Sequence, residues 1–317
     1  MARNLFEFDV YRLNVVEGDR TLFEQNNSVC GSDKDIMKIL NTAIQPDVKY
    51  IIEGKRAKYE WTMRNYEVCD YSDGEKSDVV IFITMARSMS EKMGEIVTDD
   101  GMEEGLSESN PPLAEPMMLF FYLKRHLVAV EHISKLMTSG RWQESITELT
   151  KQSAEKNGYS CWFALEPVPE IGKILEAFNT FTKLIRLRVK LRLPNPELSR
   201  YAKSLYDEMV NGGIREYLQD MRSGKGLSKE PGRIPHAATE IAQAGYKDGQ
   251  IRLEGYLDGK HKVVETGEKA VRGSIDSVRD YVRGVKAMAK TKEGKTIIAD
   301  IIREIDRIVP APDERSK

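Results

Sequence analysis

Thr-Lys-Leu-Ile-Arg-Leu-Arg-Val-Lys-Leu-Arg-Leu, residues 182–193, is the stretch that decides the fold of this chain. From Ile185 onward, an aliphatic residue occupies every odd position and a cation every even position. This alternation predicts a β-strand, because successive strand side chains point to opposite faces whereas a helix would mix the two sets. The aliphatic row should enter the core and the cationic row should face outward; the rows are Ile185, Leu187, Val189, Leu191 and Leu193, and Arg186, Arg188, Lys190 and Arg192.

The cationic row suggests a binding surface for a polyanion. Like charges side by side repel one another unless they are solvated, paired with carboxylates or matched to a negative ligand. Side chains on one face of a strand repeat at about 6.6 Å, close to the spacing of phosphates along an extended nucleic-acid strand. We therefore predict that the row contacts a nucleic-acid backbone. Two structural alternatives remain: an edge strand that cations protect against aggregation, and a row paired with a neighbouring acidic strand.

Further cations follow on later segments. A helix starting at Asn195-Pro196 carries two of them, the loop over residues 222–235 carries more, and a helix over 277–289 has a stripe of cations at helical spacing. Since several phosphate contacts are needed for useful affinity at physiological salt, we add to the predicted surface Arg200, Lys203, Arg279, Arg283 and Lys286. A solvated helix face is the alternative for the stripe.

The distribution of charge along the chain points the same way. The 317 residues have a net charge of −2, but residues 1–118 hold 13 Lys and Arg against 23 Asp and Glu, and the remainder is net positive. Such asymmetry is typical of chains that bind nucleic acid or another polyanion.

The order of expected elements indicates an α+β protein. We expect an N-terminal domain with a mixed or antiparallel sheet over residues 1–178, and a basic domain over 179–317 with the basic strand and C-terminal helices. Expected strands cover 4–16, 57–70, 78–89, 117–123, 127–130, 160–166, 250–256 and 262–265. Expected helices cover 33–45 (capped by Ser32), 142–156, 170–179, 196–209 with a continuation over 214–221, 277–289 and 296–309.

Residues 91–116 are acidic and poor in apolar periodicity, and we predict an exposed, mobile loop. The loop is either a solvated insertion or a segment that folds over the basic face and competes with nucleic acid until a polyanion displaces it.

Signals for chemistry are weak. The four histidines have no metal-ligand spacing, and the hydrolase, phosphate-loop and dinucleotide motifs are missing, so we predict no catalytic residue, metal or cofactor. The three cysteines are far apart, which favours buried free thiols. Glu53-Gly54-Lys55, close after Asp47, superficially suggests the carboxylates and lysine of a metal-dependent nuclease, although a simple turn explains it as well.

From about residue 117 to 260, the chain resembles the phage-exclusion sensor RexA and, more loosely, the DNA-binding B subunit of the Kiwa defence system. The likeness lies in the order of Met117–Val130, the helix around Trp142, the strand Cys161–Glu166, then Leu184–Leu193 and helices ending near Arg222. It rests on this pattern, covers less than half of the chain and transfers no single residue. The resemblance implies a dimeric, largely sequence-independent DNA binder that senses phage replication and signals to an effector protein.

Together these observations predict a cytoplasmic protein without membrane insertion that binds nucleic acid, DNA rather than RNA, forms a homodimer and acts in bacterial antiphage defence. One alternative is a nuclease or another nucleic-acid-processing enzyme whose acids meet only in the folded chain. The other is an assembly or adaptor subunit whose basic face docks an acidic protein surface, including the acidic loop of a second copy.

Overall fold

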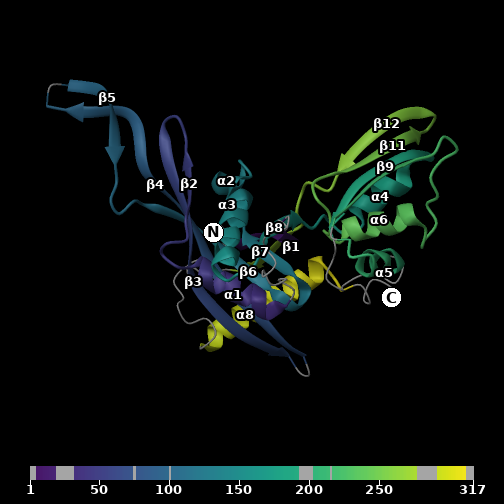
Figure 1. Cartoon of the computed structure of the whole chain (residues 1–317), viewed down its shortest axis with the longest axis horizontal. Coiled ribbons are helices and arrows are strands. Elements are labelled where there is room, and N and C mark those ends of the chain that lie inside the picture. The colour runs from purple at the N-terminus through teal and green to yellow at the C-terminus, as the bar shows by residue number, and fades with distance from the viewer. Residues whose placement is uncertain are drawn as a thin grey trace.

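The computed structural model describes residues 5–18, 32–73, 76–99, 101–192, 203–214, 216–276 and 291–311. Strands and helices are both abundant in these ranges, so the expected α+β class is confirmed (Figure 1). The strands form two antiparallel sheets, one of nine strands and one of four. No helix within the described ranges is both long and apolar enough to span a membrane.

The first sheet has the strand order β13-β1-β7-β6-β4-β3-β2, with β5 beside the outer part of β4 and β8 beside the end of β1. The strands are β1 (Leu5–Glu17), β2 (Tyr50–Glu53), β3 (Ala57–Asp73), β4 (Lys76–Thr98), β5 (Gly101–Glu108), β6 (Ala114–Tyr122), β7 (Leu127–Glu131), β8 (Cys161–Pro167) and β13 (Arg272–Asp276). A 3-10 turn, η1 (Leu123–Arg125), links β6 to β7.

Helices cover both faces of this sheet. On one face lie α1 (Asp33–Ala43), α2 (Ser134–Met137) and α3 (Arg141–Lys156), and on the other lies α8 (Lys292–Ile308). The apolar run in β6 therefore divides by parity: Leu119 and Phe121 pack under the first group, and Phe120 packs under α8. The strands over 117–130 are therefore buried on both faces, which is why their sequences are continuous apolar runs.

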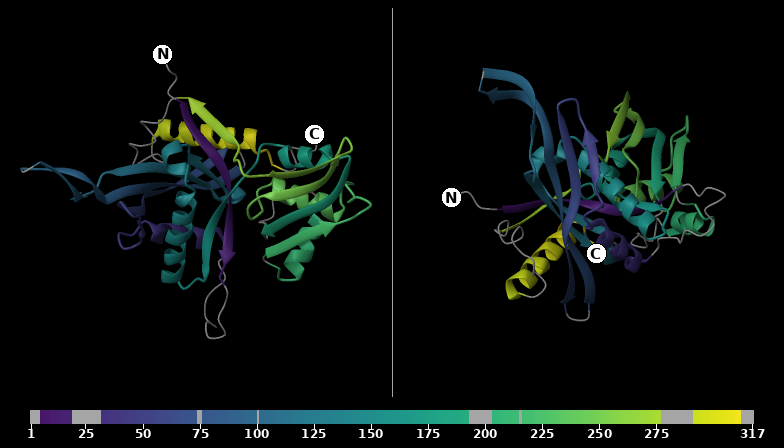
Figure 2. Two further views of the ribbon diagram at one scale, coloured as in Figure 1. Left: turned by 90° about the horizontal axis from the view of Figure 1, so that it is seen from above. Right: turned by 60° about the vertical axis from the view of Figure 1, so that its left-hand side comes forward.

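The second sheet has the order β10-β9-β11-β12, formed by β9 (Lys183–Arg192), β10 (Glu216–Arg222), β11 (Ile251–Leu257) and β12 (Lys260–Thr266). Its inner face packs on α4 (Lys173–Thr180), α5 (Lys203–Asn211) and α6 (Ile234–Gln243). No helix of the described chain packs on its outer face (Figure 2).

The basic segment is a strand, as predicted, but its core row differs at one end. Leu187, Val189 and Leu191 are fully buried, whereas Ile185 is half-buried and Leu184 takes the core position. The reason is a bulge, because the pairing with β11 shifts register between Glu254 and Gly255 and skips one residue of β9. Leu193 lies outside the described residues.

Two predictions of secondary structure are wrong. Residues 91–98 and 101–108 are paired strands instead of a mobile loop, and the hairpin they form extends away from the rest of the molecule (Figure 1). Residues 216–222 are strand β10 instead of a helix, because α5 ends at Asn211 and the chain turns through Gly212 and Gly213 to pair with β9. The helix expected over 277–289 lies outside the described residues.

The C-terminal part returns to the first sheet. β13 pairs with β1, and α8 buries Ile298, Ile301 and Ile305 against that sheet. The segment before β9 and the segment after β12 meet at this point, since the Val271 amide donates to the Val168 carbonyl at 2.7 Å. The described part of residues 272–311 therefore packs with the first sheet, whereas the sequence analysis assigned it to the basic domain.

Candidate functional site

The predicted cations of β9 face the open side of the second sheet, but acids stand beside them. Residues that lie directly opposite each other on paired strands share a face of the sheet. β10 places Glu216 opposite Arg192 and Asp220 opposite Arg188, and β11 places Glu254 opposite Arg186. The acids that interleave with the cations therefore come from neighbouring strands.

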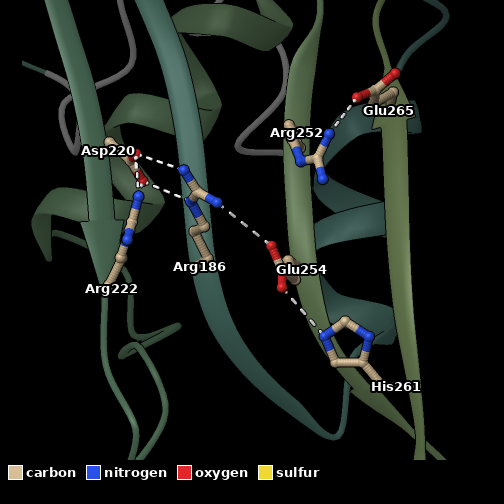
Figure 3. A network of polar contacts seen from close by, with 7 residues as sticks. All are labelled: Arg186, Asp220, Arg222, Arg252, Glu254, His261 and Glu265. Carbon is tan, nitrogen blue, oxygen red and sulfur yellow. Dashed lines mark hydrogen bonds and ion pairs between the residues drawn. The ribbon is translucent and has the colours of Figure 1, made fainter.

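Arg186 is bound by carboxylates on both sides (Figure 3). Its Nε and Nη2 donate to the two oxygens of Asp220 at 2.8 and 2.7 Å, and its Nη1 lies 3.7 Å from Glu254. Arg222 donates to the same Asp220 at 3.0 Å, and Glu254 also contacts His261 at 3.2 Å. The hydrogen bonds from Arg186 and then Arg222 hold the pKa of Asp220 well below its usual range. This network neutralises Arg186.

Lys190 and Arg192 share carboxylates in the same way. The Lys190 Nζ lies 2.7 Å from Asp248 and 3.0 Å from Glu216, and the Arg192 Nη2 lies 3.1 Å from Asp248. Hydrogen bonds to Asp248 and then Glu216 raise the pKa of Lys190. Three of the four cations in the row are thus paired with acids, which is one of the two structural alternatives to phosphate binding.

Arg188 is the exception. Its side chain is exposed, and within the described residues no carboxylate is ion-paired with it. It borders a hollow of about 610 Å³ together with Lys190, Leu218 and Arg252. Arg252 itself pairs with Glu265 at 3.0 Å. Among the described residues, Arg188 is thus the one cation of the row left to bind a polyanion, whereas useful affinity needs several such contacts.

Of the other predicted contacts, Lys203 alone falls on a described element. Lys203 is the first residue of α5, and four predicted residues lie outside the described ones: Arg200, Arg279, Arg283 and Lys286. In the loop after β10, the Lys229 ammonium donates to the carbonyls of Asn179 and Phe181, so it fastens the end of α4 instead of facing a ligand.

The nuclease alternative gains no support from Glu53, Lys55 and Asp47. Glu53 and Lys55 are exposed around the turn between β2 and β3, and Asp47 is paired with Lys156 of α3. Within the described residues, no group of three or more His, Cys, Asp or Glu side chains could hold a metal ion.

Sequence reasoning missed a buried ion pair between the two sheets. Lys247, which follows α6, has a side chain only 1% exposed, and its Nζ lies 3.7 Å from Glu166 of β8. This is too long for a hydrogen bond, and among the described residues the Nζ has no other hydrogen-bond partner. Burial lowers the pKa of Lys247 and raises that of Glu166. In the sequence, Lys247 is a single lysine between Tyr246 and Asp248, and nothing in this segment indicates a buried ion pair.

A second cluster has the order of a catalytic triad. Asp9 accepts from the Nδ1 side of His132 at 2.8 Å, and the Nε2 of His132 lies 3.1 Å from the Ser134 hydroxyl. However, the Arg272 guanidinium lies 2.9 Å from His132 and 2.8 Å from Asp9. The guanidinium of β13 thus contacts both the carboxylate of β1 and the imidazole that follows β7. The cluster therefore serves to tie β13 to β1 and β7.

The hairpin that replaces the predicted loop is the most unusual surface of the described chain. We call residues 93–108, which comprise the outer part of β4 and all of β5, the arm. Beyond Lys92, β4 no longer pairs with β3, and the pairing with β6 ends at Ser88, so in the arm the two strands pair only with each other. Among the described residues, the outer edge of β5 is therefore open, and so is that of β4 beyond Met93, whose amide donates to the Arg56 carbonyl.

One face of the arm alternates acidic and apolar pairs. Starting from the base, opposed residues on this face are Glu91 with Glu108, Met93 with Leu106, Glu95 with Glu104 and Val97 with Met102. The apolar side chains are well exposed, at 41% for Met93, 47% for Leu106, 67% for Met102 and 80% for Val97. We call this surface the striped face.

The opposite face of the arm covers itself. Ile96 lies over Gly105 so closely that a Cβ on this glycine would be 2.3 Å from the isoleucine Cδ1. Ile96 is half-buried as a result. The arm therefore has one apolar face that is covered from within and one that is not.

Comparison with protein families assigns most of the second half of the chain to a known family. A family described as "Domain of unknown function (DUF4747)" matches residues 92–280, more than half of the chain. The match starts at the base of the arm and includes the second sheet and β13. A search of curated proteins finds no match.

Proposed function

We propose that this chain, which belongs to the DUF4747 family, is an assembly or adaptor subunit that binds another protein through the arm. The observation that carries the proposal is the striped face. Four large apolar side chains stand on a two-stranded hairpin that lies away from the rest of the molecule (Figure 2).

The energetics of the arm support a docking role. An isolated two-stranded hairpin is only marginally stable in water. Burying one side chain of this size completely contributes about 1.5–3 kcal/mol. The apolar pairs of the striped face offer a partner several such contributions, and the covering partner would stabilise the arm in turn. Acids that merely protect an open edge from aggregation would not require Val97 and Met102 at the exposed tip.

The charge of the arm selects the partner. Residues 93–108 contain Glu95, Asp99, Asp100, Glu103, Glu104 and Glu108 and no lysine or arginine. Nucleic acid and anionic lipid would be repelled by this surface. A basic protein surface complements it.

Cross-linking in cells tests the proposal. A photoreactive amino acid at Val97 should link the chain to one defined protein, which mass spectrometry identifies, whereas the same group at the exposed Ile234 of α6 should not. The purified partner should then bind the wild-type chain and lose at least about tenfold in affinity for the Val97→Ser/Met102→Ser variant. Equal affinity for both chains would disprove the docking function, and cross-links only between identical copies would replace it with homo-oligomerisation.

Nucleic-acid binding is the second candidate, and the observation in its favour is the unpaired Arg188. Replacing Arg188 with Ala should weaken binding to DNA of arbitrary sequence and reduce its salt dependence. Arg186→Ala is the matched control, because Arg186 already spends its hydrogen bonds on Asp220. Gel shifts at two salt concentrations measure both. Equal binding by the Arg188 variant and the wild type would show that DNA does not bind to the outer face of the second sheet.

The role in antiphage defence and the homodimer stay predictions of the sequence analysis. The autoinhibitory alternative requires the arm to reach the basic face. In both views of Figure 2 the arm extends away from the second sheet, which argues against contact within one chain.

A further inference from the structure

The arm offers an edge as well as a face. The striped face and the open edge of β5 belong to the same strand, and the hydrogen-bonding groups along this edge have no strand partner among the described residues. A strand added to such an edge completes a ladder of main-chain hydrogen bonds, and its side chains fall in line with those of the strand it joins.

The order of side chains along β5 defines what that added strand must carry. On the striped face, β5 presents Glu108, Leu106, Glu104 and Met102 at successive positions. Side chains directly opposite across two antiparallel strands lie about 4.5–5.5 Å apart, so each position of the guest meets one position of β5. The guest strand therefore needs a cation opposite each glutamate, so that no like charges lie side by side. It also needs an apolar side chain opposite Leu106 and opposite Met102.

We propose that the partner of the arm contributes a β-strand with cations and apolar residues alternating at every second position, which adds to the free edge of β5. This inference rests on the proposed docking function and specifies its partner. The pattern is cation, any residue, apolar, any residue, repeated. It differs from an ordinary amphipathic strand, in which all cations lie on one face and all apolar residues on the other.

The face of the arm opposite the striped face explains why only one side of the guest strand is recognised specifically. Ile96 sits against Gly105 and leaves Glu103 as the only acid of β5 on that face. Residues of the guest that point to the Ile96 side therefore meet a smooth surface with one charge, and many side chains suit those positions.

Synthetic peptides test the inference with the full-length chain. Lys-Thr-Leu-Thr-Lys-Thr-Leu-Thr-Lys has the required order, and Lys-Leu-Thr-Thr-Lys-Thr-Thr-Leu-Lys has the same composition with Lys and Leu on opposite faces. Fluorescence anisotropy should give the first peptide an affinity at least about tenfold higher than the second. Replacing its Lys by Glu should abolish binding. Equal binding of the two basic peptides would overturn the proposal and indicate attraction by net charge alone.

Variants of the arm provide the reciprocal test. Glu104→Lys should weaken binding of the first peptide and allow binding of its Glu counterpart, while Glu103→Lys, which changes the net charge equally on the opposite face, should leave the preference as it was. If both substitutions act alike, side-chain order on β5 is not read.

Strand addition itself is tested by methylating backbone nitrogens of the peptide. Methyl groups on one alternate set of residues should abolish binding, and methyl groups on the other set should not, because only one set faces β5. Tolerance of both sets would exclude a ladder. Cross-linking at Val97 to another protein combined with failure of every peptide would leave the docking function standing and disprove strand addition.

Discussion

At the scale of single residues, the alternation in β9 determines which side chains are buried. We expect Leu187→Ala to lower the free energy of unfolding by about 2–5 kcal/mol, because a fully buried leucine leaves a cavity. Ile185→Ala should cost clearly less, since the bulge leaves Ile185 half-buried. Urea denaturation of the two variants compares them. Equal losses would mean that the bulge does not exist in solution.

The buried ion pair makes a prediction about pH. Glu166→Gln removes the carboxylate that is ion-paired with Lys247 and leaves a buried charge, which should cost about 3–5 kcal/mol at pH 7. Because burial lowers the pKa of Lys247 below its unfolded value, the folded state releases its proton first as the pH rises. The variant should therefore regain stability between neutral pH and the unfolded lysine pKa of about 10.4.

The double variant Lys247→Met/Glu166→Gln is the control for that prediction. It contains no buried charge at this position, so it should be more stable at pH 7 than Glu166→Gln and lose the added dependence on alkaline pH. Denaturation curves at pH 7 and at alkaline pH measure both effects. A Glu166→Gln variant that is as stable as the wild type at pH 7 would show that Lys247 is already neutral there.

At the scale of elements, the sequence predicted a strand wherever alternation was strict and misjudged it where acids broke the apolar row. Met93, Glu95 and Val97 in fact share a face, as do Met102, Glu104 and Leu106, but a row that mixes apolar and acidic residues resembles a solvated loop. The wrong helix at β10 has a different cause. Its pairing with β9 is a contact distant in sequence, which local periodicity does not report.

Substitutions of two glycines test whether the packing of Ile96 holds the arm together. Gly105→Val would place a side chain where Ile96 lies, whereas Gly94→Val adds one with nothing within 4 Å. We expect faster amide hydrogen exchange across residues 93–108 in the first variant only, with little change in global stability, because the arm pairs with no other strand. Equal exchange in both variants would show that Ile96 does not hold the hairpin together.

At the scale of the whole molecule, composition and the order of elements predicted the α+β class correctly. They did not predict which acids pair with which cations. The sequence placed the four cations on one face of a strand, yet the acids that pair with three of them, such as Asp220 and Asp248, lie tens of residues away along the chain. Charge pairing across a sheet depends on register, and register is set by the tertiary fold. The candidate surface that replaced them, the arm, was located by sequence as an acidic segment and given its geometry only by the structure.

The hydrogen bond between Val271 and Val168 has a consequence for engineering. The chain leaves the first sheet and comes back to it at neighbouring points, so we expect that the described residues between them can be separated from it, although this removes the buried Lys247–Glu166 pair. Replacing residues 170–269 with a short Gly-Ser linker should yield a folded remnant that keeps β1, β13 and α8 together, and the excised piece should fold by itself on its own core. Circular dichroism and cooperative melting of both pieces would test this. The remnant would carry the arm without the second sheet, so the arm could be grafted, displayed or repeated independently of that sheet.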